Sequence, residues 1–239
     1  MPGKASVIDA AVVFLARLLG GGSLLLLLVG GVGLVRLQLP DGAALAWDAG
    51  LSLAFFVQHS LMVRRSVKAR MARHLPARYL GAVYAMASGI VLAAVALLWQ
   101  RTGGRILLVE GPARWLLHLV DGLALAGFAW GVVSLRHFDP FGVRPIRLHA
   151  LGRTEPPSVL TVRGPYRWVR HPLYLVVLVL LWASPVVTAD RLLLDVLWTA
   201  WIVAGTILEE RDLLAEFGAP YHDYQRRVPM LVPWRGPVG

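Results

Sequence analysis

Residues 79–100 read YLGAVYAMASGIVLAAVALLWQ, an apolar run without a charged side chain. About 18 such residues are enough for a helix to cross the hydrocarbon core of a bilayer. Similar runs lie on both sides of it, and together they give six candidate spans: residues 8–36, 43–63, 79–100, 115–135, 172–188 and 192–208. The sequence therefore predicts an all-α fold, a polytopic transmembrane bundle of about six membrane helices with a cytoplasmic C-terminal helical segment.

The composition agrees with a chain surrounded mostly by lipid. Of its 239 residues 57% are hydrophobic and only 16% are charged, whereas soluble domains carry about 25% charged residues. There is no cysteine, which excludes disulfides, thiolate metal sites and a cysteine nucleophile, so any thiol in the chemistry belongs to a substrate. The histidines form no His-x-x-x-His pair, and we expect no metal site.

The basic residues predict the orientation. The net charge of +10 gathers in short segments between the apolar runs, as orientation signals and anionic lipid headgroups require, rather than in a nucleic-acid footprint. Segments 64–78 and 136–171 are the richest, and the positive-inside rule makes them cytoplasmic. We therefore expect a multi-pass protein of the cell inner membrane, with both termini and any active site at the cytoplasmic face and no obligate protein partner.

The last two predicted spans form a helical hairpin. Only Ala189, Asp190 and Arg191 separate them, just after Ser184 and Pro185, so the two helices must be antiparallel. We accordingly expect two parts in the chain. Residues 1–135 hold the N-terminal transmembrane helices, and residues 136–239 hold the cytoplasmic loop, the hairpin and the C-terminal segment that form a cofactor pocket.

Both ends of this hairpin carry polar residues. Residues 164–174 read GPYRWVRHPLY, and Pro172 suits the first turn of a helix, so Arg170 and His171 precede an N-terminus that favours anions. The alternative is that they are interfacial anchors. The second helix is expected to end at Glu209 and Glu210, where the helix dipole disfavours acids, so a functional carboxylate that complements a sulfonium or amino group is the more attractive interpretation. The hairpin should bring Glu209 to His171.

The ordered motifs Gly-Pro-Tyr, Arg-His-Pro-x-Tyr, Glu-Glu, Phe-Gly, Tyr-x-x-Tyr and Arg-Val-Pro span about residues 158–233. In this order they resemble the isoprenylcysteine carboxyl methyltransferase superfamily. The resemblance implies an S-adenosylmethionine pocket built by the last helices and the C-terminal segment. It implies these cofactor-binding residues: Ser158, Val159, Leu160 and Thr161 through their backbone, and Tyr166, Arg170, His171, Tyr174 and Glu209.

Two positions depart from the prenylcysteine enzymes. Gly205 replaces an arginine that contacts the substrate carboxylate, and Leu151 replaces a glutamine. The segments Gln58–Met62, Arg136–Gly142 and 208–233 instead resemble the bacterial methanethiol S-methyltransferases, which make dimethyl sulfide. That resemblance implies a small thiol substrate beside membrane lipid. The alternatives are a lipid or isoprenylcysteine-type methyltransferase, or a non-enzymatic membrane protein of the NnrU type.

Methyl transfer from a sulfonium is an in-line displacement that requires a thiolate, and a small thiol is mostly protonated at neutral pH. A base or a positive field should therefore assist. The candidate catalytic residues are His59 at the end of the second span, His137 at the end of the fourth, and Glu210. For each histidine, the alternative is a hydrogen bond to a neighbouring helix.

Overall fold

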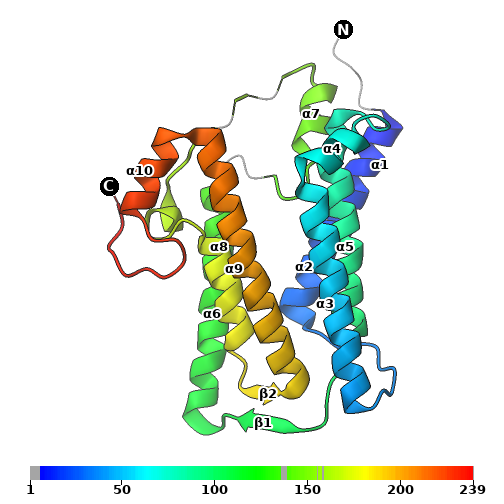
Figure 1. The fold of residues 1–239 in the computed structure, drawn as a ribbon, viewed down its shortest axis with the longest axis vertical. Coiled ribbons are helices and arrows are strands. Elements are labelled where there is room, and N and C mark those ends of the chain that lie inside the picture. Colours follow the sequence, from blue (N-terminus) through cyan, green and yellow to red (C-terminus); the bar gives the residue numbers. More distant parts are fainter. Residues whose placement is uncertain (1–5, 136–138, 155, 158, 239) are drawn as a thin grey trace. The chain divides into compact units, whose positions relative to one another are not determined.

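The structure is a computed structural model, and it describes residues 6–135, 139–154, 156–157 and 159–238. These residues are mostly helical, with one small two-stranded sheet (Figure 1). They form two compact units. Unit 1 comprises Met1–Thr102 and Asp139–Pro157, and unit 2 comprises Gly103–Phe138 and Ser158–Gly239. The division into 1–135 and 136–239 expected from the sequence stays a prediction.

Unit 1 is a bundle around helix α5. Its elements are α1 (Val7–Ala16), η1 (Arg17–Gly21), α2 (Gly22–Leu25), η2 (Leu26–Gly30), α3 (Asp41–Val63), α4 (Arg65–Met71), η3 (Ala77–Tyr79), α5 (Leu80–Leu98) and α7 (Arg144–Ala150). The continuous helix from α1 to η2 and helix α3 both pack on α5. A Cβ on Gly89 of α5 would lie 2.4 Å from the Leu19 carbonyl oxygen, so the helices approach closely only because this residue has no side chain.

Unit 2 contains β1 (Arg105–Leu108), α6 (Gly111–Ser134), η4 (Gly164–Arg167), α8 (Pro172–Trp182), β2 (Val186–Thr188), α9 (Ala189–Phe217) and α10 (Ala219–Arg227). Helix α8 packs against both α6 and α9. Strands β1 and β2 pair antiparallel, with Arg105 opposite Thr188 and Leu108 opposite Val186. This pairing closes the end of the unit where α8 leads into α9 (Figure 1).

The structure confirms a polytopic helical membrane protein, and α8 and α9 form the expected hairpin with different bounds. Four of the described helical stretches are long and apolar enough to cross a bilayer: Val7–Leu28, Ala77–Leu98, Gly111–Ser134 and Ala189–Phe217. The predicted helix 172–188 is wrong in its second half. Helix α8 stops at Trp182, and Val186–Thr188 is a strand. Eleven residues of helix reach only about 16 Å, roughly half of the hydrocarbon core.

The predicted end of the last long helix near residue 208 is also wrong. Helix α9 continues to Phe217, so Glu209 and Glu210 lie about two turns inside it. The helix dipole acts mainly within the last turn. The dipole therefore does not disfavour a structural role for these acids, and the contacts of each carboxylate show its role instead.

Candidate active site

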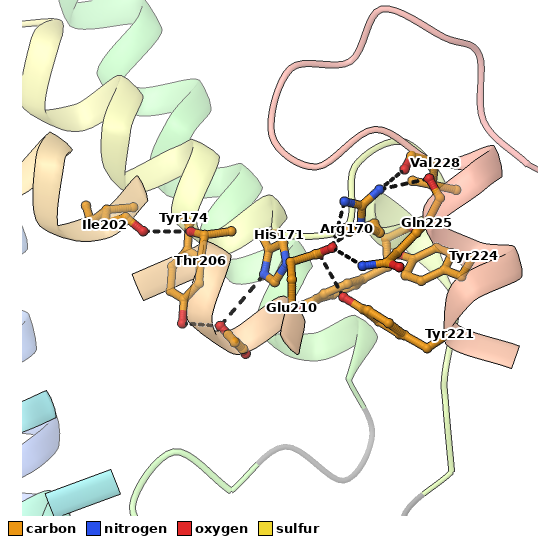
Figure 2. A network of polar contacts seen from close by, with 12 residues as sticks. Arg170, His171, Tyr174, Ile202, Thr206, Glu210, Tyr221, Tyr224, Gln225 and Val228 are labelled. Atoms are coloured by element: carbon orange, nitrogen blue, oxygen red, sulfur yellow. Dashed lines mark hydrogen bonds and ion pairs between the residues drawn. The ribbon is translucent and has the colours of Figure 1, made fainter. Parts of the chain in front are cut away.

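Glu210 of α9 is the centre of a buried polar network in unit 2 (Figure 2). Its Oε1 accepts hydrogen bonds from Arg170 Nε at 2.8 Å, His171 Nε2 at 2.6 Å and Tyr221 OH at 2.8 Å. Its Oε2 accepts from Arg170 Nη2 at 2.7 Å and Gln225 Nε2 at 2.6 Å. The residue is 8% exposed. Five donors thus satisfy a buried carboxylate that would otherwise be strongly destabilising.

Arg170 joins the loop before α8 to the C-terminal segment. Beyond its bidentate pair with Glu210, its Nη1 donates to the Val228 carbonyl. The backbone continues the link, because the Arg170 N–H donates to the Pro229 carbonyl at 2.9 Å and the His171 N–H to the Met230 carbonyl at 3.1 Å. The guanidinium is therefore occupied by protein acceptors, and a role of Arg170 towards a cofactor stays a prediction.

Helix α10 contributes two buried tyrosines to the same structure. Tyr221 and Tyr224 form an apolar cluster with Val228, against which Leu160 packs. Burial raises the pKa of both phenols, and in Tyr221 the hydrogen bond to the Glu210 carboxylate raises it further. Both hydroxyls therefore stay protonated at physiological pH and act as donors, Tyr221 to Glu210 and Tyr224 to the Tyr166 carbonyl at 2.5 Å.

The neighbouring carboxylate has a different environment. The Glu209 side chain is 42% exposed and accepts a hydrogen bond from Tyr174 OH at 2.7 Å, while His171 Nδ1 lies 3.8 Å away. The rings of His171 and Tyr174 stack with centroids 5.5 Å apart and an angle of 6° between their planes. Burial raises the pKa of the Tyr166 phenol, and the Glu209 charge raises it further. Glu209 thus presents a negative charge beside two parallel aromatic faces.

The structure brings together six of the predicted site residues: Tyr166, Arg170, His171, Tyr174, Glu209 and Glu210. Thr161 donates to the Val159 carbonyl at 3.2 Å, and Leu160 supports the α10 cluster. Their contacts with a cofactor stay predictions. Ser158 and His137 lie outside the described residues.

His59 lies in unit 1, on α3. Its ring is 5.2 Å from that of Phe55, and the Tyr84 hydroxyl lies 2.7 Å from His59 Nε2. Sequence reasoning missed Gln225, whose side chain and backbone both reach the Glu210 network. It noted Tyr221 only as part of the Tyr-x-x-Tyr motif. A lone glutamine in a polar helix gives no signal, because its role depends on a partner far away in the sequence.

Comparison of the sequence with known proteins shows to which family the chain belongs. A family model described as NnrU protein matches residues 49–227. A methanethiol S-methyltransferase of Pseudomonas sp. strain GM41 is 37% identical over 86% of this chain and 81% of its own length, and methanethiol S-methyltransferase 2 of Bradyrhizobium diazoefficiens is 40% identical over 80% and 74%. Nurim of Mus musculus is 30% identical over 72% of this chain and 68% of its own.

No solved structure matches the chain. Each of these relatives aligns over most of its own length and most of this chain at 30% identity or more. The NnrU model matches α5, α6, α8 and α9, and so includes the helix that carries Glu210. The Glu210 network and its neighbour Glu209 therefore lie inside the shared region. On these grounds the chain belongs to the NnrU family and to the family of the methanethiol S-methyltransferases.

Proposed function

We propose that the protein is an S-adenosylmethionine-dependent S-methyltransferase that converts methanethiol to dimethyl sulfide at the cytoplasmic membrane face. The observation that carries this proposal is the half-exposed Glu209 carboxylate beside the stacked rings of His171 and Tyr174. The names of the relatives support the reaction class and the choice of substrate.

The residues around Glu209 fit S-adenosylmethionine chemically. The cofactor carries a sulfonium and an ammonium group and has ribose hydroxyls. A carboxylate held by the Tyr174 hydroxyl accepts hydrogen bonds from the ammonium or the hydroxyls, and such charge-assisted bonds are the strong ones. The parallel faces of Tyr174 and His171 favour a nearby cation through their π electrons. When bound, the cofactor supplies an electrophilic methyl group.

The chain itself orients the reactants. Glu210 holds Arg170, His171, Tyr221 and Gln225 in one arrangement, and this arrangement fixes the His171 ring against Tyr174. A precise position is what an in-line displacement requires, because the nucleophile must approach to about 3–3.5 Å along the axis of the breaking bond. We therefore assign Glu210 as the residue that positions the site, rather than as a base, because its oxygens already accept five hydrogen bonds.

The thiol proton has to leave before or during transfer. His59 and His137 remain our candidates for receiving it. His59 has a polar neighbour in the Tyr84 hydroxyl, which can orient its ring. A His59→Gln variant that keeps cofactor binding but loses turnover most strongly at low pH would support this role.

The small-thiol substrate is supported by space near the carboxylate. Gly205 lies one turn before Glu209 on α9 and therefore on the same helix face. A Cβ placed on Gly205 would meet nothing within 4 Å. No guanidinium reaches that face from this position, so a substrate carboxylate has no partner there, whereas a small apolar thiol needs only a dry space beside the methyl group.

The cytoplasmic face is supported by the basic segments 64–78 and 136–171, which the positive-inside rule keeps on that side. S-adenosylmethionine is a charged soluble molecule, and a site at this face receives it directly from the cytosol. Labelling or proteolysis of α10 tests this orientation: α10 should be protected in intact cells and accessible in inverted membrane vesicles.

The decisive experiment is turnover by purified protein. In detergent with S-adenosylmethionine, it should convert methanethiol to dimethyl sulfide, measured by headspace gas chromatography, and should leave a farnesylcysteine analogue unmethylated. Gly205→Arg should depress methanethiol turnover by filling the open space. Turnover of a prenylcysteine or a phospholipid, with none of methanethiol, would overturn the substrate. Calorimetry that detects no cofactor binding to folded protein would overturn the methyltransferase.

A further inference from the structure

The β1 strand of the β1–β2 ribbon has an apolar surface that lies exposed among the described residues of unit 2. Ile106, Leu107 and Leu108 of β1 are 41–60% exposed, although they pair with β2. Three consecutive large apolar side chains in water would be unusual for a surface ribbon, because such surfaces mark contacts with a partner or a membrane.

The helices fix how far the ribbon lies from the Glu210 network. Ala189 follows β2 directly, and the stretch of α9 from there to Glu210 is about 32 Å long at 1.5 Å per residue. Helix α6 gives a similar length of about 35 Å from Gly111, just after β1, to Ser134. Ser134 lies against Gly164 of η4, the short helix that leads to Arg170. Both lengths match a hydrocarbon core of roughly 30 Å, and the ribbon lies at the end of unit 2 away from α10 (Figure 1).

The residues around the ribbon are of the types that favour the headgroup region of a bilayer. Trp115 near the start of α6 is exposed, and exposed tryptophans gather where lipid headgroups meet acyl chains. Arg105 and Arg114 are exposed too, and their charge complements anionic headgroups. The outer edges of a two-stranded ribbon have backbone groups that need water or headgroups, which keeps the ribbon out of the hydrocarbon centre.

We infer that the β1–β2 ribbon, with Trp115, is an anchor that lies in the headgroup region of the bilayer at the end of unit 2 opposite the Glu210 network, and that its partner is the phospholipid surface. The anchor has a structural purpose. Helix α8 is too short to cross the core by itself, so an interfacial ribbon at its end sets the depth of the hairpin. The inference does not depend on the proposed catalytic activity.

The absence of cysteine makes a direct test possible. Ile106→Cys in the full chain gives a single labelling site for a nitroxide, in vesicles of phosphatidylcholine with phosphatidylglycerol. Two matched variants give the scale: Leu123→Cys, at an exposed site in the middle of α6, and Asp223→Cys, at an exposed site on the polar helix α10. Power saturation with oxygen and with a neutral nickel chelate then reports the depth of each label.

The nickel collision rate at residue 106 should fall several-fold below that at residue 223 and stay above that at residue 123. A label at residue 106 as accessible to nickel as that at residue 223 would show that the ribbon lies in water and would overturn the inference. A label as deep as that at residue 123 would also overturn it. So would a label shielded from both reagents with strong spin coupling between chains, because a second copy would then cover the ribbon.

Discussion

Glu210→Gln is the substitution that separates a structural carboxylate from a catalytic one. The side chains of Arg170 and Glu210 are each 10% exposed, and removing one charge from a buried pair costs about 3–5 kcal/mol because the other stays uncompensated. Glutamine keeps one oxygen that still accepts a hydrogen bond, so we expect the lower end, about 3 kcal/mol. For a domain of this size, that lowers the melting temperature by roughly 6–12 °C.

Glu209→Gln is the matched control one residue away. Its side chain is 42% exposed, and an amide oxygen still accepts from Tyr174, so we expect a stability cost below about 1 kcal/mol. The loss of one charge-assisted hydrogen bond to the cofactor, worth about 1.5–3 kcal/mol, should weaken S-adenosylmethionine binding by roughly 10–100-fold. Thermal unfolding in detergent and calorimetry measure the two effects separately.

The two variants should therefore show different defects. Glu210→Gln should be unstable, and Glu209→Gln should be stable but should bind the cofactor weakly. A Glu210→Gln protein that melts like the wild type while its turnover collapses would refute our reasoning, because Glu210 would then act in the chemical step. Equal destabilisation by both substitutions would show that Glu209 is a structural residue too.

Three further predictions test other parts of the molecule. Tyr174→Phe keeps the ring stacked on His171 but removes the bond to Glu209, so calorimetry should find cofactor binding weakened by about 2–10-fold, and unchanged affinity would contradict the role of this hydroxyl. Gly89→Ala should lower the free energy of unfolding by about 1–3 kcal/mol, because its Cβ would lie 2.4 Å from the Leu19 carbonyl oxygen of η1. Gly22→Ala has open space around its Cβ and should cost far less. Equal effects in thermal unfolding would disprove the close crossing of the two helices. Methanethiol turnover should rise with pH as the thiolate fraction grows, and a flat profile in a headspace assay would show that deprotonation does not limit the rate.

The sequence was enough to predict that His171, Tyr174 and Glu209 of unit 2 lie close together. Two apolar runs joined by a few residues leave an antiparallel hairpin as the only arrangement, so the start of one helix and the far part of the next must be neighbours. The contacts of His171 with Glu210 and of Tyr174 with Glu209 follow from that topology. Their geometry follows from it as well, since adjacent residues on a helix point about 100° apart and the two acids therefore have different surroundings.

The limits of the hairpin could not be read from hydropathy. Val186, Val187 and Thr188 continue the apolar run after α8 and suit a strand as well as a membrane helix. They become a strand because β1, about 80 residues earlier in the chain, offers its backbone groups, and Pro185 has already ended the helix. A pairing between such distant segments leaves no mark in either segment alone.

The buried charge of Glu210 explains how the loop before α8, the long helix α9 and helix α10 hold one site together. The apolar cluster of α10 is small, and hydrophobic burial alone would leave that helix weakly attached. A carboxylate on α9 that requires Arg170 from the loop and Gln225 from α10 is stable only when all three segments are in place. The same requirement fixes His171 beside Glu209, so the network that holds the fold together here also sets the position of the groups that we expect to meet the cofactor.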